Sequence, residues 1–414
     1  MSGVVDPRNA PERSVVVSGL GQSDVGRPLQ RSGLDLTLDA CLEAIADAGL
    51  TRNDIDGISA YPGPMAAPPG FAGPGTTDVQ NALGLRCDYH RSGQEGAAQF
   101  SAIIDAVMAV ATGMARHVLV YRTVTEASAQ KGGGRSGIGL DGADLSSGGA
   151  GQGPKRIRMG GEFAWQLPMG AFSAANWTAW YAQRHMHEYG LTREQLGAIA
   201  LNGRANAARN PKAVYTAPMT MDDYLSARMI SEPLCLFDCD APCDGSTAFV
   251  ISHVDHAPDM PRPAVRFEAM GGSRHRHSHW DQGGDFTTMA GSEAAAAMWR
   301  RTTLTPADVD TAQLYDGFSW LTIMWLEALG FCRRGEAGGF VEGGKRIALD
   351  GELPLNTWGG QLSGGRLHGF GFLHEAVTQL RGEGGARQIQ RRPEVAVAAA
   401  GGGPIAGCFV LTRV

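Results

Sequence analysis

Residues 356–375 read N-T-W-G-G-Q-L-S-G-G-R-L-H-G-F-G-F-L-H-E, and six glycines in this stretch stand among a tryptophan, an arginine and a few other polar side chains. Glycine has no Cβ, so such a backbone can approach a ligand or a neighbouring element closely. After Gly371, apolar residues return at helical spacing. A glycine turn that opens a helix presents N–H groups to anions and oxyanions. The stretch therefore predicts either an oxyanion site or a glycine-rich crossing of packed elements.

The chain is long and mildly acidic. Its 414 residues are enough for two domains, or two fused half-domains, around a large core. A net charge of -6 and a pI of about 6.0 lack the basic character of a nucleic-acid binder. The N-terminus has no apolar signal region, and no window approaches about eighteen consecutive apolar residues. We therefore expect a cytoplasmic protein that binds no nucleic acid and does not enter a membrane.

The seven cysteines are odd in number and lie mostly among apolar residues, as reduced core thiols do. One cluster, Cys235, Cys239 and Cys243, has no fourth ligand nearby. Structural zinc is held by four ligands, usually in closer pairs. We therefore expect no metal site and no bound cofactor.

One order of elements occurs twice. The first copy has a strand at 14–20, a helix at 35–49, the segment L-T-R-N-D-I-D-G-I-S-A-Y from Leu50, a small-residue helix from Glu95 and a strand from His117. The second copy has a strand from Val265, a helix from Ala290, the segment L-T-P-A-D-V-D-T-A-Q-L-Y from Leu304, the glycine turn at 359–371 with its helix, and a strand from Val395. This repetition predicts a duplicated α/β fold whose two halves, 1–255 and 256–414, are related by a pseudo-twofold axis.

Other material separates the two copies. Residues 128–161 hold glycine, serine and lysine with hardly an apolar side chain, and this composition predicts a long loop or insertion near the site. A helix follows from Asn176. Its Trp177, Trp180 and Tyr181 favour core or dimer packing over a cofactor-binding role.

With both copies in view, the sequence resembles the thiolase superfamily, and more closely its lipid-transfer-protein branch of sterol carrier protein X-like thiolases, which includes steroid side-chain aldolases. The motifs that carry the resemblance are A-V-A-T-G-M-A-R-H-V-L-V-Y-R-T-V-T-E from Ala109, L-F-D-C-D-A-P-C-D-G from Leu236, L-Y-D-G-F from Leu314, L-E-A-L-G-F-C-R-R-G-E from Leu326 and L-N-T-W-G-G-Q-L-S-G-G-R-L-H-G from Leu355. The resemblance implies an α-β-α-β-α layered fold in which each half has a mixed five-stranded sheet.

The residues that thiolases use for acyl transfer are absent. Counting back from the A-T-G at 111–113, the position of the nucleophilic cysteine falls on Gly96. The asparagine, histidine and second cysteine of thiolases correspond to Tyr315, Arg366 and Ala399. A thiolate at a helix N-terminus is what such an enzyme needs for a covalent acyl intermediate. We therefore expect no acyl-enzyme.

The resemblance implies a carbon–carbon lyase that cleaves a bulky, steroidal or isoprenoid 3-hydroxyacyl-CoA by retro-aldol chemistry. We expect Tyr315, Arg366 and His368 to be catalytic, Asp316 to be a further acid/base candidate, and backbone near Gly96, Gly360 and Gly402 to bind substrate or the oxyanion. Steroid aldolases carry a tyrosine at the position of Arg366. Arginine does not deprotonate, so it can stabilise an enolate but cannot act as the base.

Three histidines alternate in H-R-H-S-H, and His275, His277 and His279 would share one face of a strand. The alternatives for them are an exposed loop, an acid/base or substrate contact, and a metal site, which the lack of a carboxylate at ligand spacing disfavours. His374 and Glu375, inside the last predicted helix, favour a structural role.

The alternative functions are a thiolase-type acyltransferase and a non-catalytic acyl-CoA or lipid-binding subunit. The resemblance also implies a homodimer and a small partner protein with an OB-fold and a zinc ribbon. Coenzyme A enters as part of the substrate.

Overall fold

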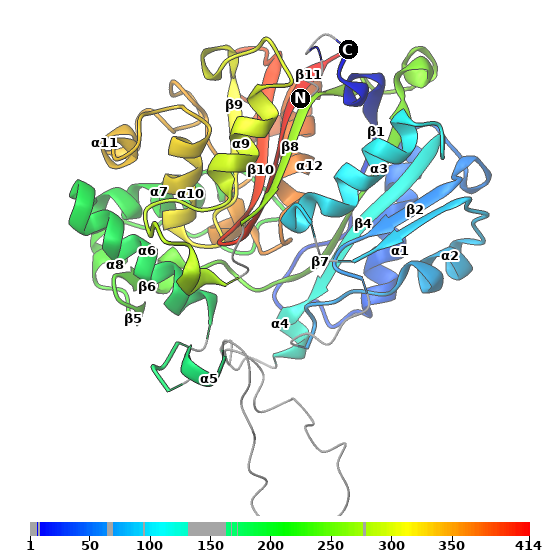
Figure 1. The fold of residues 1–414 in the computed structure, drawn as a ribbon. Helices are drawn as coiled ribbons and strands as arrows, with labels where there is room; N and C mark the ends of the chain where they lie inside the picture. Colours follow the sequence, from blue (N-terminus) through cyan, green and yellow to red (C-terminus); the bar gives the residue numbers. More distant parts are fainter. Residues whose placement is uncertain are drawn as a thin grey trace, which may run out of the picture.

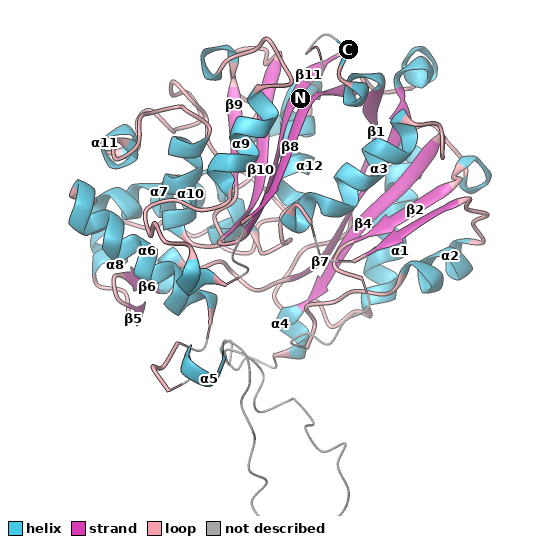
Figure 2. Ribbon diagram, viewed as in Figure 1, coloured by secondary structure: helices cyan, strands magenta, loops and turns pink. Residues whose placement is uncertain are grey.

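A single mixed sheet runs through the whole molecule (Figures 1 and 2). The computed structural model describes residues 6, 9–63, 69–93, 96–130, 163–166, 168–171, 173–275 and 279–414. The nine strands of this sheet are, in sequence, β1 (Val15–Gln22), β2 (Gly57–Ala60), β3 (Tyr89–Ser92), β4 (His117–Thr125), β7 (Asp244–His253), β8 (Val265–Arg274), β9 (Thr311–Leu314), β10 (Val395–Gly402) and β11 (Ile405–Arg413). A separate hairpin pairs β5 (Met229–Ser231) with β6 (Leu234–Cys235).

The strand order repeats on either side of one central seam. Along the sheet the order is β3-β2-β4-β7-β1-β8-β11-β10-β9, and β1 pairs antiparallel with β8 at the centre. Outward from this seam, each side has two antiparallel steps and then a parallel step, through β7, β4 and β2 on one side and β11, β10 and β9 on the other. The predicted duplication is therefore confirmed. In the described chain the first half contributes the expected five strands, but the second half contributes four and not five, because no strand pairs with β9 in the way that β3 pairs with β2. All nine are hydrogen-bonded into one sheet.

Helices cover both faces of each half (Figure 1). The α-helices are α1 (Gly33–Asp47), α2 (Thr76–Leu83), α3 (Ser101–Ala111), α4 (Glu126–Ala129), α5 (Phe163–Gln166), α6 (Ala174–Tyr189), α7 (Arg193–Ala207), α8 (Met221–Leu225), α9 (Gly291–Trp299), α10 (Ser319–Ala328), α11 (Ala337–Val341) and α12 (Phe370–Arg381). In the first half α1 packs on β1 and β7, while α3 packs on β2 and β4. In the second half α9 packs on β8 and β11, while α12 packs on β9 and β10. The pairs α1/α9 and α3/α12 are thus equivalent. Among the described helices, none is long and apolar enough to cross a membrane.

The helices α6, α7 and α8 precede residue 255 in sequence but pack beside the second half (Figure 1). Both α6 and α7 contact α10, and α7 also contacts α11 and the π turn Gly360–Gly364. Tyr181 on α6 is buried, and its hydroxyl donates to the carbonyl of Trp280 at 2.7 Å. The packing role predicted for this aromatic helix is therefore confirmed for Tyr181.

Two predicted segments differ from the structure or lie outside it. The helix expected from Glu95 begins later, because a 3-10 turn at Ala98–Phe100 leads into α3. The predicted insertion at 128–161 falls almost wholly outside the described residues. The proposed boundary after residue 255 lies in the 3-10 turn Val254–Asp259, between the last strand of one half and the first strand of the other.

Candidate functional site

Tyr315 is the first residue after β9, and the glycine-rich stretch holds it in place. The Asn356 side chain continues the edge of β9, since its Oδ1 accepts from the Leu314 N–H at 2.7 Å and its Nδ2 donates to the Leu314 carbonyl at 2.9 Å. Gln99 from the first half donates to the Tyr315 hydroxyl at 3.3 Å. Burial raises the pKa of the Tyr315 phenol to about 12, although the Arg366 cation acts in the opposite direction. At physiological pH this side chain is therefore a neutral phenol.

Arg366 is clamped between two carboxylates that come from the first half of the sequence. Its Nη1 donates to both oxygens of Glu126 at 2.7 Å, and its Nε lies 3.0 Å from Asp240 Oδ2. Its backbone N–H also donates to the Ala241 carbonyl at 2.8 Å, which ties the glycine-rich stretch to the L-F-D-C-D-A-P segment. Burial lowers the pKa of Arg366, but the two carboxylates outweigh burial and raise the pKa above its ordinary value. The guanidinium is permanently charged and cannot act as a base.

His368 adopts a left-handed backbone conformation, with φ of +53°, at a buried position. Such a conformation is uncommon for a residue with a side chain and persists only where the surroundings enforce it. The ring lies against Tyr61 and Phe71, with centroid separations of 5.7 and 4.7 Å. Arg122 Nη2 lies 3.2 Å from His368 Nδ1. The imidazole is therefore confined on several sides by first-half residues.

These groups form one buried cluster. The Phe71 ring contacts both Arg366 and His368. The Arg366 cation opposes the effect of burial on the pKa of Tyr315, and the Arg122 and Arg366 cations together oppose it for Tyr61. The cluster also contains buried polar atoms that have no hydrogen-bond partner among the described residues: Gln99 Oε1, Arg122 Nε and both amide atoms of Gln361. Native proteins leave few such atoms, and they concentrate where a ligand or water binds.

The first-half members of this cluster were not predicted from the sequence: Tyr61, Phe71, Gln99, Arg122, Glu126 and Asp240. Two signals were present. Tyr61 follows β2 in A-Y-P-G just as Tyr315 follows the equivalent β9 in L-Y-D-G. Arg122 interrupts the apolar strand H-V-L-V-Y-R, where a charge needs a partner.

Asp316 was predicted as a possible acid or base, and its carboxylate lies beneath the π turn. Its Oδ1 accepts from the Gln361 N–H at 2.7 Å. Burial raises the pKa of the Asp316 carboxyl to about 7, against hydrogen bonds from the Gln361 and Leu362 backbone. A Cβ on Gly360, whose φ is +59°, would lie 1.9 Å from Asp316 Oδ2. Gly360 is therefore a glycine because the carboxylate needs its space.

No described contact places the two other glycine candidates, Gly96 and Gly402, in this cluster. Gly96 has φ of +121°, and a Cβ there would meet Ser101 at 3.4 Å. A Cβ on Gly402 would lie 2.8 Å from Leu321 of α10. Substrate or oxyanion binding at Gly96, Gly360 and Gly402 stays a prediction.

The strand predicted for the alternating histidines is wrong at both described positions. β8 ends at Arg274, so His275 follows the strand, and His279 only precedes the 3-10 turn Trp280–Gln282. His275 donates its backbone N–H to the Pro404 carbonyl, and its Nε2 lies 3.7 Å from Glu293 on α9. His277 lies outside the described residues. The physical reason is that the sheet pairing of β8 with β11 stops where β11 begins, at Ile405.

Comparison with known proteins identifies the family. Residues 272–411 match the model described as Thiolase C-terminal domain-like. A steroid side-chain-cleaving aldolase of Thermomonospora curvata is 35% identical over 374 residues, covering 89% of this chain and 90% of the relative. The chain belongs to the thiolase-fold aldolase family. A 17-hydroxy-3-oxo-4-pregnene-20-carboxyl-CoA lyase of Mycobacterium tuberculosis is 34% identical over 376 residues, covering 88% of this chain and 91% of the relative.

A solved structure agrees with this membership. The structure of an Ltp2-ChsH2(DUF35) aldolase matches this thiolase-fold aldolase with a TM-score of 0.82 and 31% identity, covering 97% of this chain and 98% of that one. Human mitochondrial 3-ketoacyl-CoA thiolase, at 13% identity and a TM-score of 0.67, shares the fold. The α/β fold and the enzyme class expected from the sequence are confirmed.

One cysteine of this thiolase-fold aldolase lies against the glycine-rich stretch. A Cβ on Gly365 would be 3.2 Å from Cys243 Sγ. That thiol is fully buried, and burial raises its pKa well above the ordinary value. It directly precedes β7 and does not open a helix, and burial together with the charges of Glu126 and Asp244 outweighs the Arg366 cation, so the thiol is not activated as a thiolate. Within the described chain no group of three or more His, Cys, Asp and Glu side chains could hold a metal ion.

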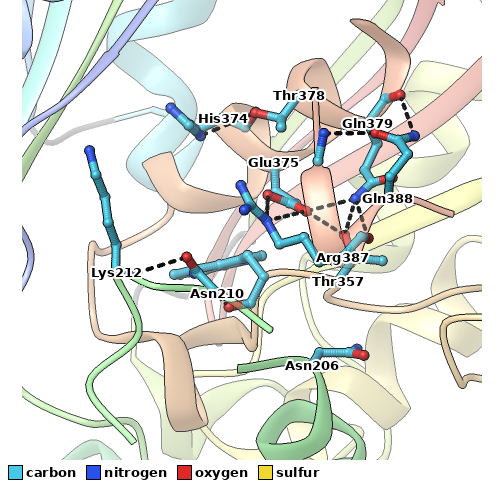
Figure 3. A network of polar contacts seen from close by, with 12 residues as sticks. Asn206, Asn210, Lys212, Thr357, His374, Glu375, Thr378, Gln379, Arg387 and Gln388 are labelled. Carbon is cyan, nitrogen blue, oxygen red and sulfur yellow. Dashed lines mark hydrogen bonds and ion pairs between the residues drawn. The ribbon is translucent and has the colours of Figure 1, made fainter. Parts of the chain in front are cut away.

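On the far side of the glycine-rich stretch, α12 is anchored by a polar network (Figure 3). Glu375 accepts from Thr357 Oγ1 at 2.7 Å and pairs with Arg387 at 3.0 Å. Burial, together with the neighbouring cation of Arg387, lowers the pKa of His374 to about 3, so this ring is neutral. The network joins α12 to Thr357 and to the segment after the helix, which agrees with the structural role expected for His374 and Glu375.

Proposed function

We propose that this protein cleaves the Cα–Cβ bond of a bulky, steroidal 3-hydroxyacyl-CoA by retro-aldol chemistry, without a covalent acyl-enzyme. The observation that carries the proposal is the match, over about nine tenths of the chain, to two enzymes whose names specify steroid side-chain cleavage and a 17-hydroxy steroid carboxyl-CoA. A buried cluster that contains a phenol, an imidazole and two guanidinium groups supports it.

The reaction moves one proton and breaks one bond. The hydroxyl oxygen on Cβ loses its proton and becomes a ketone, the Cα–Cβ electron pair passes to Cα as a thioester enolate, and Cα gains a proton. We propose that Tyr315 gives its phenolic proton to Cα while it accepts the hydroxyl proton, so that it is regenerated without a free phenolate. A neutral phenol with a pKa of about 12 suits such a relay better than it suits a general base at pH 7.

The enolate oxygen needs donors that are in place before the bond breaks. His368 is proposed as the donor nearest to this oxygen, because its ring is already confined by Tyr61 and Phe71. Arg366 contributes positive charge at short range, but Glu126 and Asp240 occupy it. We therefore propose that Arg366 holds the site together and tunes Tyr315, and that it does not bind the substrate directly.

A second polypeptide is part of the proposal. The related solved structure is named as an aldolase of Ltp2 with ChsH2(DUF35). We propose that this chain likewise acts with a small acyl-CoA-associated partner and as a homodimer in the cytoplasm.

The test is a product assay on the purified chain, with and without a partner of the DUF35 type. We expect 17-hydroxy-3-oxo-4-pregnene-20-carboxyl-CoA to yield one 17-ketosteroid and one shortened acyl-CoA per molecule cleaved, measured by liquid chromatography and mass spectrometry. Absence of ketone with the partner present would overturn the lyase proposal. Intact mass of the protein after incubation with acyl-CoA tests the alternative, because an acyl adduct on Cys243 or another thiol would indicate acyl transfer.

A further inference from the structure

We propose that Arg122 holds His368 in one tautomer, with the proton on Nε2, so that His368 acts in the reaction as a hydrogen-bond donor and not as a base. This inference rests on the function proposed above and assigns Arg122 a positioning role within it. The observation behind it is the contact between Arg122 Nη2 and His368 Nδ1.

The chemistry of a guanidinium determines the direction of this hydrogen bond. Every nitrogen of an arginine side chain donates and none accepts. A contact of 3.2 Å between Nη2 and Nδ1 is therefore an N–H donated to an unprotonated Nδ1. In a neutral imidazole one nitrogen carries the proton and the other does not, so the proton of His368 lies on Nε2.

Arg122 itself has little freedom. It lies on β4, its side chain is about 1% exposed, and its Nη1 donates to the Thr123 carbonyl at 2.9 Å. The guanidinium carbon lies 5.4 Å from the Tyr61 ring centroid and 4.9 Å from that of Phe71. These two rings also contact His368. The same aromatic pair thus aligns the donor and the acceptor.

The charge around the pair favours this arrangement. Burial lowers the pKa of Arg122 to about 10, so the side chain stays charged at neutral pH. Among the described residues no carboxylate lies within ion-pair distance of Arg122; Glu126, whose charge acts on Arg122 from further away, pairs with Arg366. A second proton on His368 would place an imidazolium N–H against the guanidinium N–H groups. A proton on Nδ1 would point at a group that can only donate, so the contact with Arg122 favours a ring that carries its proton on Nε2 alone.

A His368 of this kind complements Tyr315. The thioester oxygen becomes an enolate oxygen when the Cα–Cβ bond breaks, and an Nε2–H donor stabilises the charge that develops there. The hydroxyl proton must then be accepted by another group, which is the role proposed for the Tyr315 relay. Arg122 thus positions His368, although it lies in an otherwise apolar strand.

The test reads the tautomer directly and needs no turnover. Nitrogen-15 NMR on protein labelled in its histidine rings, at pH 7.5, distinguishes a ring protonated on Nε2 from one protonated on Nδ1 or on both, and His368→Gln identifies the signals by their loss. We expect Nε2–H for His368. A ring protonated on Nδ1, or on both nitrogens, would overturn the inference even if the enzyme proved to be a lyase.

Two variants connect the tautomer to catalysis. Arg122→Met removes the donor at similar volume and is expected to give a mixture of tautomers and to lower kcat by about 100-fold with KM little changed, in line with the loss of one oxyanion donor. Arg122→Lys keeps a donor and is expected to restore the Nε2–H tautomer and most of kcat. If Arg122→Met kept both the tautomer and kcat, Arg122 would have no positioning role. If it misfolds, the wild-type spectrum alone decides.

Discussion

Helix α3 of the first half and helix α12 of the second half begin in the same way and carry different side chains. Just before each helix stands one residue with φ of +53°, Ala98 in the first half and His368 in the second. A glycine with positive φ lies near each, Gly96 at +121° two residues before Ala98 and Gly369 at +95° directly after His368. Each half thus places one side-chain-bearing residue in a left-handed conformation at the entrance to the equivalent helix. A methyl group occupies one copy and an imidazole the other, so the reactive groups gather in the second half.

Residues of the first half contribute to the site by packing closely against the second half. A Cβ on Gly369 would lie 2.5 Å from Gln99 Cβ, and one on Gly401 would lie 2.7 Å from Ala98 Cβ. The segments that lead into the two helices therefore cross with almost no space between them. The crossing brings the Gln99 amide to Tyr315.

Substitution of the two tyrosines at equivalent positions, Tyr315 and Tyr61, should give the largest difference in kcat. We expect Tyr315→Phe to lower kcat by about 10²- to 10⁴-fold, because it removes the group that transfers the proton. Tyr61→Phe is expected to lower kcat by less than about tenfold, since its ring keeps its contacts with Arg122 and His368. Steady-state kcat and KM of both variants measure the difference. Equal losses would mean that the two halves share the chemistry.

A pH profile of the wild type is the control for this pair. With a Tyr315 pKa of about 12, the neutral phenol is the dominant form throughout the range from about pH 6 to about pH 10. The part of the rate that depends on Tyr315 should therefore be flat there and fall only above that range. A rate that rises tenfold with each pH unit would identify the phenolate as the reactive form and contradict the relay.

Arg366→Ala should cost about 3–5 kcal/mol of unfolding free energy, because it leaves Glu126 and Asp240 buried and uncompensated. Arg346→Ala is a matched control, since Arg346 pairs with Glu352 at 2.7 Å in an exposed position. There the expected loss is at most about 1 kcal/mol. Chemical denaturation of both variants gives the two values, and similar losses would contradict the buried clamp.

Asp316 adds a pH dependence to stability. Its pKa rises from about 4 in the unfolded chain to about 7 in the folded one, so the folded state holds the proton more tightly. Its contribution to stability is fully present below the unfolded pKa and is lost as the pH rises through about 7. Relative to Asp316→Asn, the wild type should therefore lose about 3 kcal/mol of stability between about pH 5 and pH 8. Denaturation curves of both proteins at both pH values test this, and a constant difference would show that the carboxyl is not perturbed.

Ala98→Gly should have the smallest effect. Relief of left-handed backbone strain offsets the lost burial of one methyl group and the greater freedom of the unfolded chain, so the change in unfolding free energy should stay below about 1 kcal/mol. We expect kcat to stay within about twofold. A large loss of kcat would mean that the start of α3 also takes part in the reaction.

The repeated pattern made the duplicated core of the fold predictable, but it missed several elements, of which the long strands β7 and β11 matter most. Strands β7 and β11 were not predicted, although both are apolar runs. β11 follows β10 through a short hairpin at Gly403, whereas the predicted repeat ended with the strand from Val395. Such strands are recognised by their pairing, because an apolar run of this length also fits a buried helix.

The site was predictable only where its residues are close in sequence. Tyr315, Arg366 and His368 lie in motifs of the second half, and the structure brings them into one cluster. Their partners Arg122 and Glu126 lie more than about two hundred residues earlier, and their roles depend on how the two halves cross. The histidines at 275 and 279 were grouped by spacing alone, and the end of β8 separates them from a common strand face.

The clamp on Arg366 also constrains how the two halves can diverge in evolution. The cation lies on one side of the duplication boundary, and Glu126 and Asp240 lie on the other. A descendant that replaces the arginine with an uncharged residue inherits two buried negative charges with no counterion. We therefore expect an alignment of relatives to show correlated substitutions at these three positions, with acidic side chains absent wherever the arginine has been exchanged for tyrosine.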